Sequence, residues 1–382
     1  MKVALVSHDS RAGGAERALL ELIDGLQERG VICSVLLRKR GWLEVELNRR
    51  GVPFAVIRYR GWISARHRSK LLNLLGLVMV LPVASQLRRW GVDVVLTNTS
   101  VIPVGALAAF LLGKPHIWHI HEFCKKEYGS TFDLGARLSI KVMGSLSALI
   151  VVNSKALEEY YIQYIPRQQI RMIYQGVNTQ AQSKSAEVLE MKPSRGQEPV
   201  KLVLVGAIQE GKGQTDAVRA LGRLIDQGMQ VELNLVGTGE PADLERVKST
   251  VSRCGMEKSV QFSGQVPDPS PIVKDSDIAL MCSRSEAFGR ATVEAMKLGK
   301  PVVGARCGAT PELIRENSNG LLYTPGDDQE LARKIKFLID NPEVARQMGE
   351  NGRRWAQEEF TVEKYAGKVL EVFEEALSGN FT

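Results

Sequence analysis

Short apolar runs, rich in β-branched residues, alternate with longer amphipathic stretches along most of this 382-residue chain. Residues 15–27 form the clearest amphipathic stretch, with Leu19, Leu22 and Leu26 on one helical face. Such alternation of strand and helix predicts a parallel sheet with helices on both faces. The runs that we predict as strands are 3–6, 31–37, 92–96, 116–120, 148–152, 201–205, 231–236, 260–262, 278–281 and 301–303.

One interruption of this alternation divides the chain. Residues 179–199 are polar and lack periodicity, which predicts a linker or a long surface loop. We therefore expect an N-terminal Rossmann-like domain over residues 1–178 and a second one over residues 200–355. The remaining residues, 356–382, form a C-terminal helical segment. Two doubly wound domains would place a cleft between them, facing the carboxyl ends of both sets of strands.

Cysteine usage and the N-terminus bear on the compartment. The chain has five cysteines, an odd number, scattered and without CxxC spacing, which favours a reduced protein over a disulfide or zinc framework. The first residues lead directly into a strand, so no signal peptide is predicted. Both observations predict a cytoplasmic protein.

The charge is distributed unevenly. Residues 1–180 hold 24 of the 50 Lys and Arg and 13 of the 43 Asp and Glu, so this half carries +11 and the rest −4. A basic half predicts an anionic partner, which leaves nucleic acid, anionic lipid and a phosphorylated acceptor open. Aromatic residues make up only 6% of the chain and no nucleic-acid motif is present, so we expect no nucleic-acid partner.

Residues 58–81 combine positive charge with an apolar run. The run at 71–81 is too short to cross a bilayer, which takes about 20 residues. Residues 65–84 therefore fit either a buried helix or a helix on a membrane surface. The basic excess favours peripheral contact with an anionic membrane, on its inner face, or an anionic acceptor. The cations before the run are Arg58, Arg60, Arg66, His67, Arg68 and Lys70.

Two glutamates eight residues apart, Glu286 and Glu294, lie on either side of a glycine turn that leads into a predicted helix. A strand end, a turn and a helix N-terminus form a phosphate site, because free backbone N–H groups point at the ligand. Carboxylates would repel the phosphate, so we expect them to hold hydroxyl groups on either side of it. A ligand with a central diphosphate and hydroxyls at both ends is a sugar nucleotide.

Two glycine-rich loops follow predicted strands. Gly13 and Gly14 open the first helix, although a glycine pair by itself is weak support for an anion site. Residues 206–212 fit Gly-x-x-x-x-Gly-Lys, but Gly213 follows where a P-loop has the Ser or Thr that binds Mg²⁺. We therefore favour Lys212 as a point charge for a diphosphate, with a P-loop-like nucleoside triphosphatase as the alternative.

Histidines and acids in two further motifs could suggest a metal. His119 and His121 form a His-x-His pair at a strand end, but no third ligand has a recognisable spacing. We expect His121 to hydrogen-bond substrate, and His116 and His119 to serve either that role or the structure. Asp275 and Asp277 match a loose Asp-x-Asp pattern, and we interpret them as capping and solvated acids.

In combination these motifs make the chain resemble the family 4 retaining glycosyltransferases, which have the GT-B architecture of two facing Rossmann-like domains. The resemblance covers nearly the whole chain, and its most specific part is the E-x7-E motif of Glu286 and Glu294. It implies an α/β fold with parallel sheets, in which the C-terminal helix crosses back to the first domain. Its other motifs are 13–16, 206–213, 299–303, 308–312 and 319–323.

The resemblance also implies roles for individual residues. Lys212 would neutralise the leaving diphosphate, Glu294 would hold the ribose hydroxyls, and Glu286 would hold a hydroxyl of the transferred sugar. His121 would contact the sugar near its reacting carbon. The implied catalytic residues are His121, Lys212 and Glu286, and the implied donor-binding residues are Gly14, Gly206, Lys212, Gly239, Val266, Glu286, Phe288, Gly289, Arg290 and Glu294.

The chain departs from the family at Ala207, where an arginine usually adds a second charge on the diphosphate. Arg290 or Arg17 would have to compensate. The implied reaction is same-face attack on a UDP- or GDP-sugar, with no cofactor and no metal. The expected acceptor is a saccharide, a glycolipid or a phosphorylated small molecule, in bacterial polysaccharide, glycolipid or glycoconjugate synthesis.

Overall fold

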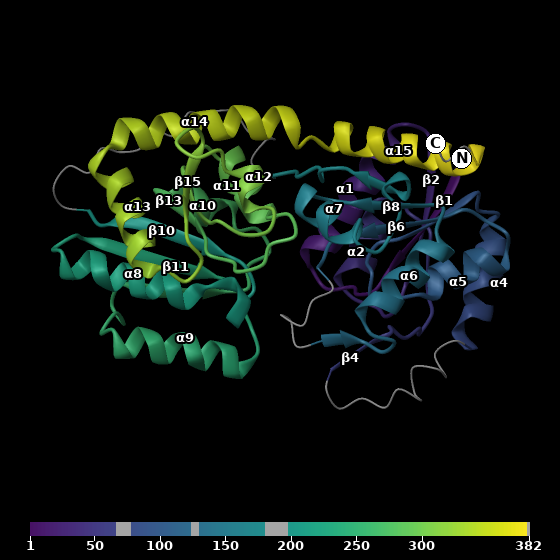
Figure 1. The fold of residues 1–382 in the computed structure, drawn as a ribbon, viewed down its shortest axis with the longest axis horizontal. Helices are drawn as coiled ribbons and strands as arrows, with labels where there is room; N and C mark the ends of the chain where they lie inside the picture. Colours follow the sequence, from purple (N-terminus) through teal and green to yellow (C-terminus); the bar gives the residue numbers. More distant parts are fainter. Residues whose placement is uncertain (66–77, 124–129, 180–197, 380–382) are drawn as a thin grey trace. The chain divides into compact units, whose positions relative to one another are not determined.

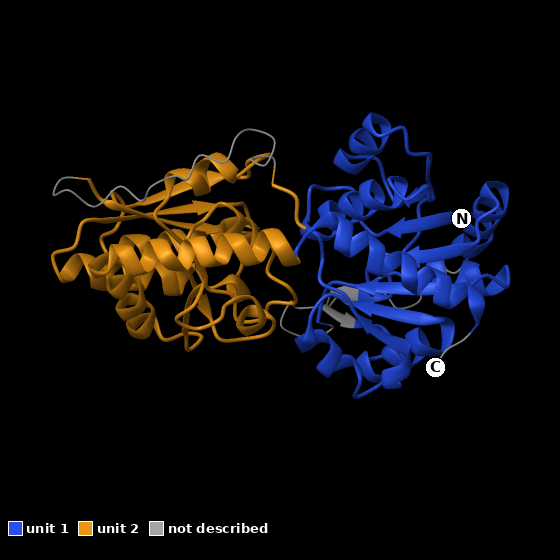
Figure 2. Ribbon diagram, turned by 90° about the horizontal axis from the view of Figure 1, so that it is seen from above, with its two compact units in different colours: residues 1–176, 360–382 blue, residues 177–359 orange. Residues whose placement is uncertain are grey.

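The computed structural model describes residues 1–65, 78–123, 130–179 and 198–379 (Figure 1). The chain forms two compact units (Figure 2). Unit 1 comprises Met1–Gly176 and Phe360–Thr382, and unit 2 comprises Val177–Glu359. Each unit contains a parallel sheet with helices packed against it, which confirms the predicted α/β class.

The main sheet of unit 1 has seven parallel strands in the order β3-β2-β1-β5-β6-β8-β9. β1 and β2 are buried along almost their whole length, which is why they appear in the sequence as continuous apolar runs. A separate antiparallel pair joins β4 (Ile63–Ala65) to β7 (Ser130–Phe132). The parallel strands are β1 (Lys2–Ser7), β2 (Ile32–Leu37), β3 (Phe54–Val56), β5 (Val94–Thr97), β6 (His116–Ile120), β8 (Leu149–Val152) and β9 (Ile170–Met172).

Helices of unit 1 include one from the far end of the chain. α15 (Val362–Ser378) packs against α1 (Gly14–Gln27), and its Tyr365 and Phe373 are buried in the same core as β1. Nε of Arg171 donates a hydrogen bond of 3.0 Å to Glu375 on α15. The other helices are α2 (Trp42–Arg49), α4 (Val80–Trp90), α5 (Val104–Leu111), α6 (Ala136–Leu146), α7 (Lys155–Tyr161) and the 3-10 helix η3 (Arg167–Gln169).

Unit 2 has a six-stranded parallel sheet in the order β12-β11-β10-β13-β14-β15. The order reverses at β10, because the chain first adds strands on one side of it and then on the other. Loops at the carboxyl ends of β10 and its neighbours therefore lie at a switch point, where open α/β sheets bind ligands. The strands are β10 (Val200–Val205), β11 (Val231–Val236), β12 (Val260–Gly264), β13 (Ile278–Met281), β14 (Val302–Ala305) and β15 (Gly320–Tyr323).

Helices α8, α9, α13 and α14 of unit 2 share one apolar core with its sheet. α8 and α13 contact each other extensively, and buried residues of both join the core formed by β10, β11 and β13. The helices are α8 (Gln214–Asp226), α9 (Pro241–Arg253), α10 (Ser270–Asp275), α11 (Arg290–Lys297), α12 (Thr310–Leu313), α13 (Asp328–Asp340), α14 (Pro342–Glu359) and the 3-10 helix η5 (Glu210–Lys212).

Part of the predicted membrane segment lies outside the described residues. Arg66, His67, Arg68, Lys70 and residues 71–77 fall there, as do residues 180–197 of the predicted linker. In the described part of the chain, no helix is both long enough and apolar enough to cross a bilayer.

Candidate active site

The loop after β10 brings a lysine to the carboxyl edge of the unit 2 sheet. β10 is followed by η5, which ends at Lys212, and then by α8. Gly213 separates the two helices with φ +68°, and a Cβ there would lie 2.1 Å from the carbonyl oxygen of Cys282. The backbone leaves no room for the Ser or Thr of a P-loop at this position, which disfavours the triphosphatase alternative.

Lys212 forms an ion pair with Glu286, the first of the two predicted carboxylates. Its Nζ lies 2.8 Å from Oε2 of Glu286, and only 22% and 13% of the two side chains are exposed. Glu286 lies in the loop after β13, where its carbonyl oxygen accepts a hydrogen bond of 2.8 Å from the backbone of Ala309. The fold thus joins the predicted phosphate cation to the predicted sugar-binding carboxylate.

The second carboxylate, Glu294, lies on α11. Gly289, with φ +97°, precedes the helix, and the buried side chain of Phe288 anchors the turn. Oε1 of Glu294 lies 3.5 Å from Nη2 of Arg290, one helical turn earlier. The first N–H groups of a helix have no acceptor within it, so the start of α11 offers an anion site between the two glutamates in sequence.

Loops after β11 and β12 join the same edge through backbone hydrogen bonds. Ile208 N donates to Thr238 O, and Gly237 N donates to Gly264 O, both at 2.8 Å. A Cβ on Gly239 would lie 1.9 Å from the carbonyl oxygen of Ile208, so these loops touch closely. Unit 2 therefore brings the loops of these predicted residues to one sheet edge: Gly206, Lys212, Gly239, Val266, Glu286, Phe288, Gly289, Arg290 and Glu294.

The surroundings of Ala207 bear on how the missing charge is replaced. Its carbonyl oxygen accepts a hydrogen bond of 2.8 Å from Nε2 of Gln214. Arg290, one of the two predicted substitutes, lies on the first turn of α11 in unit 2. Arg17, the other, lies on α1 in unit 1, with its guanidinium 5.7 Å from the ring centroid of Trp42. Arg290 is therefore the stronger candidate, since it belongs to the same loops.

Unit 1 supplies a second helix N-terminus. α1 begins at Gly14, and its N-cap residue, Gly13, provides no capping side chain. Glu16 in the first turn is only 4% exposed, and its Oε1 lies 3.5 Å from Nδ1 of His8. Burial raises the pKa of Glu16, so this carboxyl group takes up a proton more readily and opposes an anion less.

His121 follows β6 and is held by amide side chains. Nε2 of His121 lies 2.7 Å from Oδ1 of Asn98, whose Nδ2 donates to the carbonyl oxygen of Ala15 at 3.0 Å. Nδ1 of His121 lies 2.5 Å from Nε2 of Gln175. Amide nitrogen donates and amide oxygen accepts, which assigns the proton of a neutral His121 to Nε2. Asn98 thus ties His121 to the start of α1, and no local sequence pattern indicated either amide.

The neighbouring histidines are structural. His119 is fully buried, and its Nδ1 lies 3.3 Å from the hydroxyl of Tyr365 on α15. Burial lowers the pKa of both His116 and His119 to about 3. The rings of His119 and His121 lie 4.2 Å apart, but the described residues contain no group of three His, Cys, Asp or Glu side chains placed to hold a metal.

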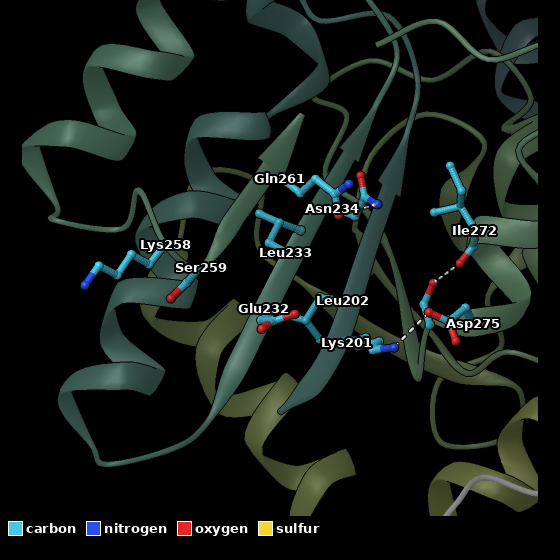
Figure 3. Close-up of a pocket in the computed structure, with 11 residues that line it drawn as sticks. Lys201, Leu202, Glu232, Leu233, Asn234, Lys258, Ser259, Gln261, Ile272 and Asp275 are labelled. Atoms are coloured by element: carbon cyan, nitrogen blue, oxygen red, sulfur yellow. Dashed lines mark hydrogen bonds and ion pairs between the residues drawn. The ribbon is translucent and has the colours of Figure 1, made fainter. Parts of the chain in front are cut away.

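The Asp-x-Asp motif lies at the opposite end of the unit 2 strands. Lys201 donates two hydrogen bonds of 2.8 Å to this motif. Its Nζ donates to Oδ2 of Asp275, and its backbone N–H donates to Oδ2 of Asp277. Asp275 and Lys201 line a polar groove of about 270 Å³ near the amino ends of β10, β11 and β12 (Figure 3). The acids therefore fasten α10 to β10, at the edge away from the loops of Lys212 and Glu286.

Two Rossmann-like units, each built on a parallel sheet, are the architecture of the GT-B class. Residues 12–181 match the family model "Glycosyltransferase Family 4", and residues 187–355 match "Glycosyl transferases group 1". The chain belongs to this glycosyltransferase family, as its motifs predicted.

The similarity to known proteins covers nearly the whole chain. It is 28% identical to 2-deoxystreptamine glucosyltransferase of Streptomyces kanamyceticus, over 94% of this chain and 98% of that protein. It is 25% identical to lipopolysaccharide core biosynthesis glycosyltransferase LpsE of Rhizobium meliloti, over 96% and 97%. The crystal structure of Anabaena HepE with UDP-glucose superposes with a TM-score of 0.82 at 25% identity, covering 98% of this chain and 100% of that one.

Proposed function

We propose that this protein transfers a sugar from a UDP- or GDP-sugar to an acceptor hydroxyl with retention of configuration. The observation that carries the proposal is the half-buried pair of Lys212 and Glu286 beside the start of α11. It joins a cation suited to a diphosphate with a carboxylate suited to a hydroxyl. HepE, whose fold matches over nearly the whole chain, was crystallised with UDP-glucose, which supports UDP as the nucleotide to test first.

Each donor group would meet a different element. Lys212 and the N–H groups at Phe288 and Gly289 would hold the diphosphate, with Arg290 replacing the charge absent at Ala207. Glu294 would accept hydrogen bonds from the ribose, and Glu286 from the sugar. In unit 1, Gly14 would offer its N–H to a donor phosphate, and His121 would contact the sugar near its reacting carbon.

The proposed reaction breaks the bond between the anomeric carbon and the diphosphate oxygen. The bonding electron pair leaves with the diphosphate, where positive charge and helix N–H groups stabilise it. The acceptor oxygen forms the new bond on the same face, and its proton passes to the leaving phosphate. Lys212 and the helix termini supply the positive charge, so we propose that the reaction needs no metal.

We propose an anionic acceptor of saccharide, glycolipid or phosphorylated small-molecule type. Cations follow the carboxyl ends of two adjacent strands of unit 1, β2 and β3. Arg38, Lys39 and Arg40 come directly after β2, and Arg58 and Arg60 come after β3. Lys39 pairs with Asp9 at 2.9 Å and Arg40 pairs with Glu44. The edge remains rich in guanidinium groups, which suit phosphate.

We also propose that residues 58–81 contact an anionic membrane surface on its inner face. Arg58 and Arg60 are exposed, and so are Val78, just before α4, and Leu81, on its first turn, by 62% and 64%. Cations and exposed apolar side chains within one stretch of the chain suit an interface with anionic lipid. Flotation with vesicles should show binding to anionic but not neutral lipid, and no binding to either would refute this part.

A panel of nucleotide sugars tests the donor assignment. A bound donor raises the melting temperature as its concentration exceeds its dissociation constant, so a UDP- or GDP-sugar should stabilise the protein and ATP should not. Glu294→Ala should abolish the shift, whereas Glu343→Ala should keep it, because 82% of the Glu343 side chain is exposed on α14. Stabilisation by ATP alone would favour a nucleoside triphosphatase instead.

A further inference from the structure

A polar groove rich in arginine lies between α8 and α9, outside the residues assigned to the donor. It has a volume of about 230 Å³ and is lined by η5, α8, α9 and the loop after β13. Guanidinium groups that lie close together repel one another unless anions separate them, so such a groove favours the binding of anions. Its cations are Arg219, Arg246, Arg253 and Arg284.

The carboxylates of unit 2 balance these cations only in part. Asp216 is fully buried and forms ion pairs with two guanidinium groups. Its Oδ1 lies 3.2 Å from Nη2 of Arg284 and 3.9 Å from Nη1 of Arg219. Arg253 meets the neutral hydroxyl of Thr250 at 3.3 Å, and no carboxylate of the described residues forms an ion pair with it. Arg219 and Arg253 therefore retain charge for a further anion.

Arg246 is paired more completely. It lies 2.5 Å from Asp243 and 3.5 Å from Glu210, but 83% of the Glu210 side chain is exposed. Solvent screening makes such an exposed pair weak, so an incoming phosphate can displace Glu210 at little cost. Arginine binds phosphate through two parallel hydrogen bonds, which makes this group of residues suited to that anion.

A buried amide oxygen adds a second requirement on the ligand. Gln214, which also lines the groove, is 2% exposed, and its Nε2 donates to Ala207 O at 2.8 Å. Its Oε1 is buried and has no hydrogen-bond partner in the protein. An unpaired buried acceptor is costly, so a small movement of the Gln214 side chain that lets a ligand hydroxyl donate to Oε1 would be favoured.

We propose that this groove is a second binding site, for a small phosphorylated molecule that also carries hydroxyl groups. The site adjoins the donor loops: Arg284 N donates to Gly211 O at 2.8 Å, and Gly211 and Lys212 belong to the same turn, η5. Its ligand therefore binds beside the donor loops and not in them. The assignment does not depend on which nucleotide the donor loops accept.

Calorimetric titration with glycerol 3-phosphate, in saturating UDP to fill the donor loops, tests the proposal. We expect saturable binding, weakened at least tenfold in the double variant Arg219→Gln/Arg253→Gln. Arg223→Gln is the matched control, because Arg223 is 47% exposed against 48% for Arg219 and pairs with Asp328 outside the groove. Binding in this control should equal that of the wild type.

The dissociation constant of UDP and the melting temperature without ligand show whether the double variant is folded. No saturable binding of glycerol 3-phosphate to the wild type would overturn the proposal, as would equal weakening in the Arg223→Gln control. The variants can also be compared without UDP, so a wrong donor assignment leaves this test intact.

Discussion

The ion pair between Lys212 and Glu286 leads to a prediction in which one substitution, Glu286→Gln, favours the binding of UDP over that of a UDP-sugar. In the free protein, the Lys212 ammonium lies 2.8 Å from the Glu286 carboxylate. A diphosphate must take this ammonium from the carboxylate or share it. Replacing Glu286 by Gln frees the cation and removes a negative charge near the phosphates.

The expected size follows from the geometry. A hydrogen bond between charged groups contributes about 1.5–3 kcal/mol net to stability or binding. The Lys212 side chain is 22% exposed, so water weakens its pair with Glu286 and places the contribution toward the lower end of that range. Glu286→Gln should therefore tighten UDP binding about 10–30-fold. Lys212→Met should weaken UDP binding about 10–100-fold, because the phosphates lose a cation and keep the opposing carboxylate. For a UDP-sugar, Glu286→Gln should gain less or lose affinity, since the sugar loses its acceptor.

Calorimetric titration with UDP and with UDP-glucose measures both effects. Lys201→Met and Asp275→Asn are the matched controls, because Lys201 and Asp275 also form a 2.8 Å ion pair at the other end of the same sheet. Neither control should change nucleotide binding. Weaker UDP binding in Glu286→Gln, or unchanged binding in Lys212→Met, would refute the assignment of Lys212 to the diphosphate.

Three further predictions concern charge, acid and metal. Arg290→Ala should weaken UDP binding several-fold in calorimetry if Arg290 replaces the charge absent at Ala207, and unchanged affinity would exclude that compensation. Burial lowers the pKa of His116 and His119 to about 3, whereas a histidine in the unfolded chain has a pKa near 6.5, so below that pH the unfolded chain binds more protons than the folded one. Urea unfolding should therefore show stability falling from pH 7 to pH 5. The variant His116→Gln/His119→Gln should lose less stability over this range, and an equal loss would assign the acid sensitivity to other groups. Transfer activity should persist in excess EDTA, whereas complete loss that Mg²⁺ restores would rule out the metal-free mechanism.

Much of the fold could be predicted from local patterns. Buried parallel strands such as β1 and β11 appear as apolar runs, and all ten predicted strands are present with ends shifted by at most two residues. The strands that we did not predict include β3, β4, β7 and β9, each of three residues, which is too short for a periodic signal. β15 lies in a motif that we recognised but did not assign as a strand.

Spacing in the sequence indicated single site residues but not their partners. Glu286 and Glu294 stand out because they flank a glycine turn, whereas the pair of Lys212 and Glu286 joins residues 74 positions apart. Gln175 reaches His121 across 54 positions. Such contacts depend on the order of strands in a sheet, which a single sequence does not encode locally. The arginine groove was missed for the same reason, since α8, α9 and a distant loop each supply part of it.

The most direct test of the donor site is a crystal structure of the protein with the nucleoside diphosphate that stabilises it most. We expect the ribose hydroxyls within hydrogen-bond distance of Glu294, and the phosphates at Lys212 Nζ and the N-terminus of α11. A nucleotide bound in the arginine groove, or anywhere away from the loops after β10 and β13, would contradict the proposed site.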